Sequence, residues 1–198
     1  HSKSDLNLNL HNSSFKSSIM IKLIHPTVEY SNSIMKMRRE FLEKDHENYI
    51  HGSANLQDYD SAQEWLTNVD KMQQRETCPK DLVDSDIYLA VREEDNKIVG
   101  IAELRHNINH PILSSWGGHI GYSVRPTERR KGYGTKILRF ILVECQKLGI
   151  QDVLLTCREN NLASERTILS GGGVYENSVW AEELKVNMKR FWIKVENS

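Results

Sequence analysis

The stretch that decides the fold covers residues 118–149 and reads GHIGYSVRPTERRKGYGTKILRFILVECQKLG. Residues 119–124 form a short run that can pair in a sheet, and residues 125–134 form a basic turn. Residues 135–148 predict a helix, because their apolar side chains recur at helical spacing. These apolar residues are Ile137, Leu138, Ile141, Leu142, Cys145 and Leu148. Gly149 follows where a helix commonly ends on a glycine.

The order strand, basic glycine loop and helix is typical of a site for an anionic group. The first turn of a helix offers unpaired backbone N–H groups and a partial positive charge. Gly132 and Gly134 carry no side chain that would block the approach to them. Six cations lie in or near this loop: Arg125, Arg129, Arg130, Lys131, Lys136 and Arg139. The pattern therefore predicts a phosphate or diphosphate cradle, and the plainer alternative is a glycine turn within a solvated charge run.

Two common phosphate-binding motifs do not fit this loop. The Walker pattern GxxxxGK[ST] is absent from the sequence. A dinucleotide fingerprint needs a third glycine where Ile137 stands, and Asp152 would begin the next strand rather than end it. What remains is Arg129-x-x-Gly132-x-Gly134, directly after a predicted strand.

This remaining motif resembles the acyl-coenzyme A loop of the GNAT superfamily of N-acetyltransferases, whose signature is [QR]-x-x-G-x-[GA]. A second match, Asn161-x-x-Ser164-x-x-x-Ile168-x-x-x-Gly172, looks like the family motif N-x-x-[AS]-x-x-x-Y-x-x-x-G. The predicted order of strands and helices over about residues 20–195 is similar to that of the family. Ile168 departs from the pattern, because many members carry a tyrosine there.

The resemblance implies an α/β fold with a mixed, mostly antiparallel central sheet of about seven strands, flanked by about four helices. We expect one GNAT-like domain over residues 20–198. Residues 1–19 are rich in Ser and Asn, and we expect them to be a leader that is disordered or not native, with Met20 as the natural start.

The remaining elements follow from periodicity and capping residues. Ser31 or Ser33 is expected to cap a first helix, and Asp58 or Asp60 a second. A short helix is predicted over residues 160–169, and a β-bulge near Lys189 or Arg190 would explain a change of apolar phase in the last strand. The other predicted strands cover residues 21–24, 87–91, 98–104, 152–157, 174–180 and 185–195. The polar connection over residues 93–97 predicts that the second and third strands form a hairpin.

Composition limits the class of protein. The chain has 198 residues, of which 38% are hydrophobic and 27% charged, with a net charge of −1, so nothing predicts nucleic-acid binding. No apolar run has the length of a membrane span. Cys78, Cys145 and Cys157 lack metal-binding spacing, so we expect no metal site. Cys145 and Cys157 lie in apolar segments, and we expect them to be packed thiols. These features predict a cytoplasmic protein.

The resemblance also implies a chemistry, which is direct acetyl transfer from acetyl-CoA to an amine of a small molecule or peptide. The cofactor would contact the backbone of Tyr122, Ser123 and Val124. Its diphosphate would lie on the N–H groups of Arg129, Arg130, Lys131, Gly132, Tyr133, Gly134 and Thr135. Asn161 and Ser164 would approach the pantetheine or the diphosphate. Asn161 also stands where a helix cap is expected, and both roles can hold together.

Proton transfer needs further groups. Glu103 is the first candidate for the base, because it interrupts an apolar strand beside the central one. The alternative for Glu103 is a salt bridge with a residue such as Arg105. His119 is the second candidate, with a polar cap of the sheet as its alternative. Since Ile168 cannot donate a proton to the leaving thiolate, Tyr122, Tyr133, Tyr175 or water remains for that role.

Other functions stay open at this stage. The first alternative is a non-catalytic acyl-CoA-binding sensor or regulatory module, and the second is a phosphate- or nucleotide-binding protein. A homodimer through the terminal strands is a family-level expectation. The acidic stretch over residues 40–60 would either attract a cationic amine or form a solvated face, and Trp116 with the loop over residues 106–118 would shape the acceptor pocket. Polyamines, amino acids, aminoglycosides and protein N-termini all remain candidate acceptors.

Overall fold

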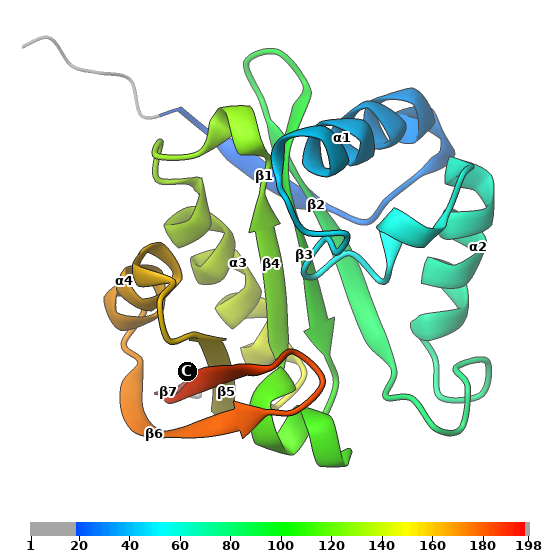
Figure 1. Ribbon diagram of the computed structural model, residues 1–198. Helices are drawn as coiled ribbons and strands as arrows, with labels where there is room; N and C mark the ends of the chain where they lie inside the picture. Colours follow the sequence, from blue (N-terminus) through cyan, green and yellow to red (C-terminus); the bar gives the residue numbers. More distant parts are fainter. Residues whose placement is uncertain (1–18, 197–198) are drawn as a thin grey trace, which may run out of the picture.

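The computed structural model describes residues 19–196, so all of the predicted leader except Ile19 lies outside the described residues. The described chain forms seven strands, which pair in two antiparallel sheets, together with four α-helices and short helical turns (Figure 1). This confirms the predicted fold class and the hairpin of the second and third strands.

The first sheet has the order β1-β2-β3-β4 and the second the order β5-β7-β6. The strands are β1 (Ile21–Ile24), β2 (Ser85–Arg92), β3 (Lys97–Arg105), β4 (Ile120–Val124), β5 (Asp152–Arg158), β6 (Val174–Ala181) and β7 (Val186–Lys194). The central strands β2 and β3 are apolar and buried on both faces, as expected for strands covered by helices on each side.

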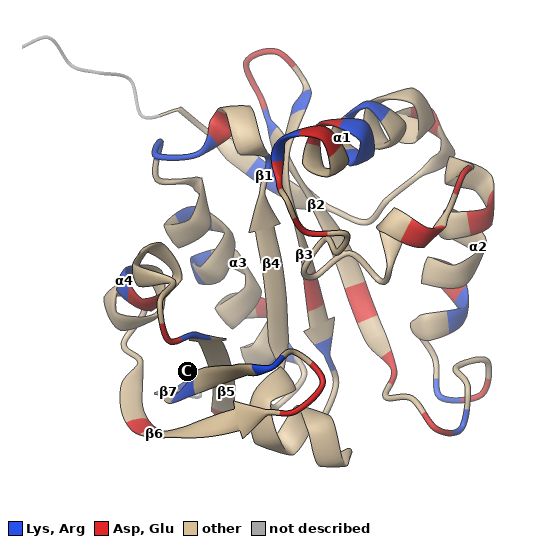
Figure 2. Cartoon of the chain, viewed as in Figure 1, with Lys and Arg blue, Asp and Glu red and all other residues tan. Residues whose placement is uncertain are grey.

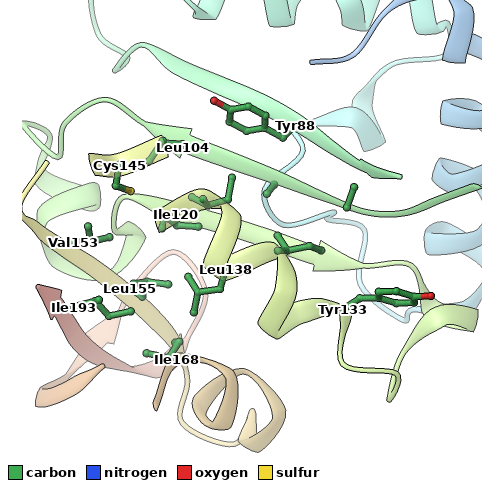
Figure 3. Close-up of a cluster of buried hydrophobic side chains, with 14 of the residues drawn as sticks. Tyr88, Leu104, Ile120, Tyr133, Leu138, Cys145, Val153, Leu155, Ile168 and Ile193 are labelled. Carbon is green, nitrogen blue, oxygen red and sulfur yellow. The ribbon is translucent and has the colours of Figure 1, made fainter. Parts of the chain in front are cut away.

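Helices cover both faces of the first sheet. On one face lie α1 (Ser31–Lys44) and α2 (Ala62–Met72), whose buried side chains form one apolar cluster with Ile87, Leu89 and Ile101. On the other face lie α3 (Tyr133–Lys147) and α4 (Leu162–Ser170), which pack on a second cluster shared with β5 and β7 (Figure 3). Burial of these two apolar faces is the main force that holds the layers together.

The two sheets meet at His119, directly before β4. Its backbone N–H donates to the carbonyl of Leu154 on β5 at 2.8 Å, and the Leu154 N–H donates to Nδ1 of His119 at 2.9 Å. From this joint onward β4 and β5 belong to different sheets. His119, one residue before β4, therefore links the first sheet to β5 of the second sheet through both its backbone and its side chain.

Several predicted helix limits and caps were wrong. The helix α3 begins at Tyr133, two residues earlier than predicted, with Gly132 as its N-cap. The helix α1 has Tyr30 as its N-cap without a side-chain bond, because a 3-10 turn leads directly into the helix. Ser61, rather than Asp58 or Asp60, caps α2 by accepting from the N–H of Glu64.

The bulge predicted in the last strand was also misplaced. The register between β5 and β7 is regular, and the irregularity lies on β6 between Tyr175 and Asn177. Met188 and Phe191 are both buried, although they lie on opposite faces of β7. The change of apolar phase therefore needs no bulge, because the two faces of this strand are covered at different positions.

Candidate functional site

The N-terminus of α3 has no side-chain cap. Gly132, its N-cap, has a φ of +83° and forms no capping side-chain bond. A Cβ at Gly132 would meet nothing within 4 Å, so the backbone angle rather than lack of space favours glycine here. The first N–H groups of α3, from Tyr133 onward, have no partner within the helix and carry its partial positive charge. This is a geometry that suits an anion.

Three of the four cations within residues 125–134, whose basic and acidic positions Figure 2 marks, are paired with acids, namely Arg125, Arg129 and Lys131. Arg129 forms a bidentate pair with Asp45, with both N–O distances at 2.7 Å, and its Nε donates to the carbonyl of Val124 at 3.2 Å. Lys131 donates to Glu128 at 2.8 Å. The backbone of the loop, more than its side-chain charge, is therefore what an anion would meet.

Glu128, which the sequence did not single out, is a buried anchor of this loop. Its carboxylate binds Arg92 at 2.8 Å, Lys97 at 2.9 Å and Lys131 at 2.8 Å. Burial alone would raise the pKa of Glu128, but the hydrogen bonds from Lys131 and Lys97 outweigh it and lower the pKa to about 2. An ionised Glu128 thus fixes the turn that precedes α3.

A second anchor comes from α1. The carboxylate of Glu40 accepts from the backbone N–H of Thr127 at 2.8 Å and from its hydroxyl at 2.6 Å, and it also pairs with Arg125 at 2.5 Å. Glu40 and Asp45 both belong to the acidic stretch. The structure uses these two carboxylates to hold the loop, so neither is free for an acceptor amine.

One edge of β4 faces away from β3. The carbonyl of His119 accepts from the Arg105 N–H, and the Arg125 N–H donates to the carbonyl of Val99. Antiparallel pairing alternates, so the odd-numbered residues of β4 bond to β3. The N–H groups of Tyr122 and Val124 therefore point to the opposite edge, on the side of β5. Ser123, between them, uses its hydroxyl to bind the carbonyl of His51 at 2.7 Å.

Four of the residues predicted to bind the cofactor gather where β4, α3 and α4 meet. The hydroxyl of Tyr122 lies 3.1 Å from that of Ser164 on α4. Asn161 caps α4 by accepting from the Ser164 N–H at 3.1 Å, so its predicted capping role is confirmed. A Cβ at Gly134 would lie 3.6 Å from the Tyr122 ring. Burial raises the pKa of Tyr122, against the effect of its hydrogen bond to Ser164.

The other two candidate tyrosines, and Ile168 at the position of the family tyrosine, lie elsewhere. Ile168 is fully buried in the core. Tyr133 is also buried, and its hydroxyl accepts from Arg92 at 3.3 Å. Tyr175 lies on β6, where its hydroxyl meets Ser178. Of the three tyrosines proposed from sequence, Tyr122 is the one that contacts α4 beside the free edge of β4.

A cavity of about 230 Å³ lies on the opposite face of the first sheet, which we call the acceptor cavity. Its lining is Tyr49, Ala54, Asn55, Tyr59, Asn68, Met72, Leu82, Val83, Glu103, Arg105, His110 and Leu113. The Glu103 carboxylate accepts from Ser85 at 2.9 Å and from Arg105 at 3.2 Å, so the salt bridge considered as an alternative is present. Glu103 pairs in register with Gly121 of β4, so it lies one strand away from the free edge.

A connection over residues 45–55, which we call the crossing segment, runs over β4 between the two sites (Figure 1). Gly52 has a φ of +71°, and a Cβ there would lie 2.3 Å from the carbonyl oxygen of Gly121. Glu47 binds Arg158 on β5 at 2.9 Å. No motif in the sequence predicted this crossing, because each contact joins residues far apart in the chain.

His119 contacts β5 rather than the acceptor cavity. Its side chain is buried, and burial followed by the charge of Arg105 lowers its pKa to about 4. Its Nδ1 accepts from Leu154, which requires a lone pair on that atom. The imidazole is therefore neutral at neutral pH and serves the joint between the sheets.

Metal-binding clusters and membrane-spanning helices are both absent from residues 19–196. The described part of the chain contains no cluster of three His, Cys, Asp or Glu side chains that could hold a metal ion. Within it, no helix is both long and apolar enough to cross a membrane. The three cysteines are buried, and burial raises the pKa of Cys157 to about 11.

The sequence and the fold are similar to those of known acetyltransferases. The family model described as "Acetyltransferase (GNAT) family" matches residues 39–169. The solved structure of RimL, a ribosomal alpha-N-protein acetyltransferase in complex with coenzyme A, has a TM-score of 0.65 and 15% identity, covering 90% of this chain and 96% of its own. The protein yncA from Salmonella typhimurium, solved with its cofactor acetyl-CoA, has a TM-score of 0.58 and 12% identity, covering 90% and 95%.

A third similar structure is a spermidine N-acetyltransferase chimera made from Vibrio cholerae SpeG and hSSAT. Its TM-score is 0.59 and its identity 16%, with 88% of this chain and 94% of the other covered. A search of curated proteins found no match.

Proposed function

The chain belongs to the acetyltransferase (GNAT) family, and we propose that it is an N-acetyltransferase that moves the acetyl group of acetyl-CoA to a primary amine. The amine attacks the thioester directly while both substrates are bound. The observation that carries this proposal is the free edge of β4, which lies between an uncapped helix N-terminus and a cavity that contains a carboxylate.

The cofactor side has the parts that acetyl-CoA needs. In our proposal the diphosphate binds the backbone N–H groups of residues 129–135, where the uncapped turn of α3 offers donors. The pantetheine lies along Tyr122–Val124, with Asn161 and Ser164 close by. A backbone N–H at the free edge of β4 then polarises the thioester carbonyl as negative charge develops on it.

Glu103 is the proposed base, acting directly or through one water. An alkyl amine is mostly protonated at neutral pH and must lose a proton before it attacks. Glu103 lines the acceptor cavity and lies one strand from the free edge of β4. His119 remains the second candidate, but its Nδ1 is already engaged by Leu154, so the contacts favour Glu103.

Tyr122 is the proposed partner of the leaving thiolate. Its hydroxyl lies between β4 and α4, at hydrogen-bond distance from Ser164. It would thus take the role that many family members give to the position of Ile168. A free thiol has a pKa of about 8.5, so the thiolate of coenzyme A can leave without a dedicated acid, and a proton or hydrogen bond from Tyr122 only assists its departure.

Two measurements test this function. Acetyl-CoA at a hundred times its Kd should stabilise the protein by about 2.7 kcal/mol, which a thermal shift detects. Turnover is then followed as acetyl-CoA consumed in the presence of a panel of primary amines. Stabilisation without turnover of any amine would favour the non-catalytic acyl-CoA sensor, and equal stabilisation by ATP would favour a general nucleotide-binding protein.

A further inference from the structure

The charges in the acceptor cavity cancel. Of its twelve lining residues, Glu103 and Arg105 are the charged ones, and they bind each other at 3.2 Å. The other terminal nitrogen of Arg105 donates to the carbonyls of Gly117 and Gly118 at 3.2 and 3.0 Å. Three of the five N–H donors of Arg105 are thus used within the protein, and its charge is balanced by Glu103, so it attracts a carboxylate on a ligand less than an unpaired arginine would.

The rest of the lining contains no Asp, Glu, Lys or Arg side chain. Nδ1 of His110 accepts from the Ile112 N–H at 3.1 Å, so this nitrogen is engaged within the protein. The apolar members are Ala54, Met72, Leu82, Val83 and Leu113, and the neutral polar members are Tyr49, Asn55, Tyr59 and Asn68. The cavity thus combines the Glu103–Arg105 pair with an aromatic and aliphatic wall.

The cavity is also small. Its volume of about 230 Å³ lies below the roughly 300–1,000 Å³ typical of sites for drug-sized ligands. A small amine or a single residue of a peptide can fill it, whereas a multi-ring aminoglycoside cannot enter it as a whole.

We infer, building on the proposed function, that the acceptor is a primary amine with one positive charge on a small, uncharged and largely apolar body. Glu103 binds the ammonium group, and the apolar wall covers the body. A polyamine would bring further charges that find no second carboxylate in the lining. A free amino acid would bring a carboxylate close to that of Glu103, and the charge of Arg105 is already balanced by Glu103 at 3.2 Å.

Two sources share this chemistry, namely a free arylalkylamine and the N-terminal residue of a peptide. Four probes separate the cases: phenethylamine, a dipeptide amide that begins with phenylalanine, spermidine and free phenylalanine. Binding is measured by calorimetry on the full chain with coenzyme A present, where no transfer can occur, and turnover is measured separately with acetyl-CoA.

We expect phenethylamine or the dipeptide amide to bind at least about tenfold more tightly than spermidine and free phenylalanine, which is about 1.4 kcal/mol. The tighter of the two identifies the source. Tighter binding of spermidine or free phenylalanine would overturn the inference, and so would failure of both favoured probes to bind. Because this readout needs no transfer, binding of the favoured probes without turnover would overturn the proposed function and leave the inference standing.

A charge at the mouth of the cavity gives a second test. Leu82 is a lining residue with 43% of its surface exposed, so Leu82→Glu adds a carboxylate there without disturbing the core. The ratio of cadaverine binding to phenethylamine binding should rise about fivefold in this variant, and it should not rise in Leu82→Gln. An unchanged ratio in Leu82→Glu would contradict the location of the acceptor.

Discussion

The two sides of β4 are built in different ways. On the cofactor side, the proposed contacts come from residues 122–135 and from the start of α4, and many of them are backbone groups. On the acceptor side, the lining residues come from the crossing segment, Tyr59, α2, the loop before β2, β3 and the loop after β3. One side is local in sequence, and the other is assembled by the fold.

This difference explains why one side can be common to a family while the other varies. Backbone N–H groups at a helix N-terminus depend on a conformation, which a short glycine motif is enough to specify. A wall of side chains depends on each residue, so a single substitution changes its charge or size. We therefore expect substitutions on the two sides to separate cofactor binding from transfer to the acceptor.

The largest expected effect is on the acceptor side. Glu103→Gln should lower kcat by about 10²–10⁴-fold, because general base catalysis is lost, while acetyl-CoA affinity stays within about twofold of the wild type. Steady-state kinetics with a reactive amine and calorimetry with acetyl-CoA measure the two quantities. Glu94→Gln, at an exposed acid in the turn between β2 and β3, is the matched control. An unchanged kcat in Glu103→Gln would show that Glu103 is not the general base.

The contact of His119 with β5, which joins the two sheets, should make the stability of the fold depend on pH. The pKa of His119 is about 4 in the folded chain and 6.5 as the ordinary value, so its contribution to stability is present above pH 6.5 and lost as pH falls through about 4. This contribution is about 3 kcal/mol. His119→Asn keeps an acceptor for the Leu154 N–H but does not titrate. The free energy of unfolding, measured with urea at pH 7 and pH 4, should fall less between the two pH values in this variant than in the wild type or in the control His46→Asn.

A matched pair of glycines tests the cofactor side. Gly132 and Gly149 lie at opposite ends of α3, with φ of +83° and +74°, and a Cβ at either would meet nothing within 4 Å. Each change to Ala should cost roughly 1 kcal/mol of stability, because a side chain disfavours positive φ. Only Gly132→Ala should also weaken acetyl-CoA binding, by about fivefold. Equal affinities in the two variants would mean that the N-terminus of α3 does not bind the diphosphate.

The smallest effect is expected at the Asp45–Arg129 pair. Both side chains are partly exposed, so the pair contributes less than about 1 kcal/mol to stability. Asp45→Asn should weaken acetyl-CoA binding by about two- to threefold, because the loop before α3 loses one of its anchors. Asp70→Asn on α2 serves as the control, and titration calorimetry resolves the difference. A variant that binds acetyl-CoA as tightly as the wild type would contradict the anchoring role.

The elements that could be predicted from sequence are those with a local cause. The apolar period of α3 predicted this helix, and the hairpin of β2 and β3 followed from two apolar runs and a polar turn. Asn161 was expected as a cap, which its bond to the Ser164 N–H confirms. In each case the residues that interact lie within a few positions of one another.

What could not be predicted depends on contacts between distant residues. Glu128 reads as part of a charge run, yet Arg92 and Lys97 from the β2–β3 hairpin surround it and make it a buried anchor. The role of Glu40 required the position of α1 relative to Thr127. Ser61 caps α2 because the chain turns there, although a local signal existed in its spacing to Glu64.

The crossing segment has a consequence for the energetics of the two ligands. It is tied to the cradle loop through Asp45, to β4 through the carbonyl of His51, and it supplies Tyr49 to the acceptor cavity. A ligand that immobilises this segment from one side relieves the other ligand of part of that ordering cost, so the two affinities become linked and must change by the same factor. In the proposed function, the binding of acetyl-CoA and the binding of the acceptor amine are then coupled through the eleven residues 45–55.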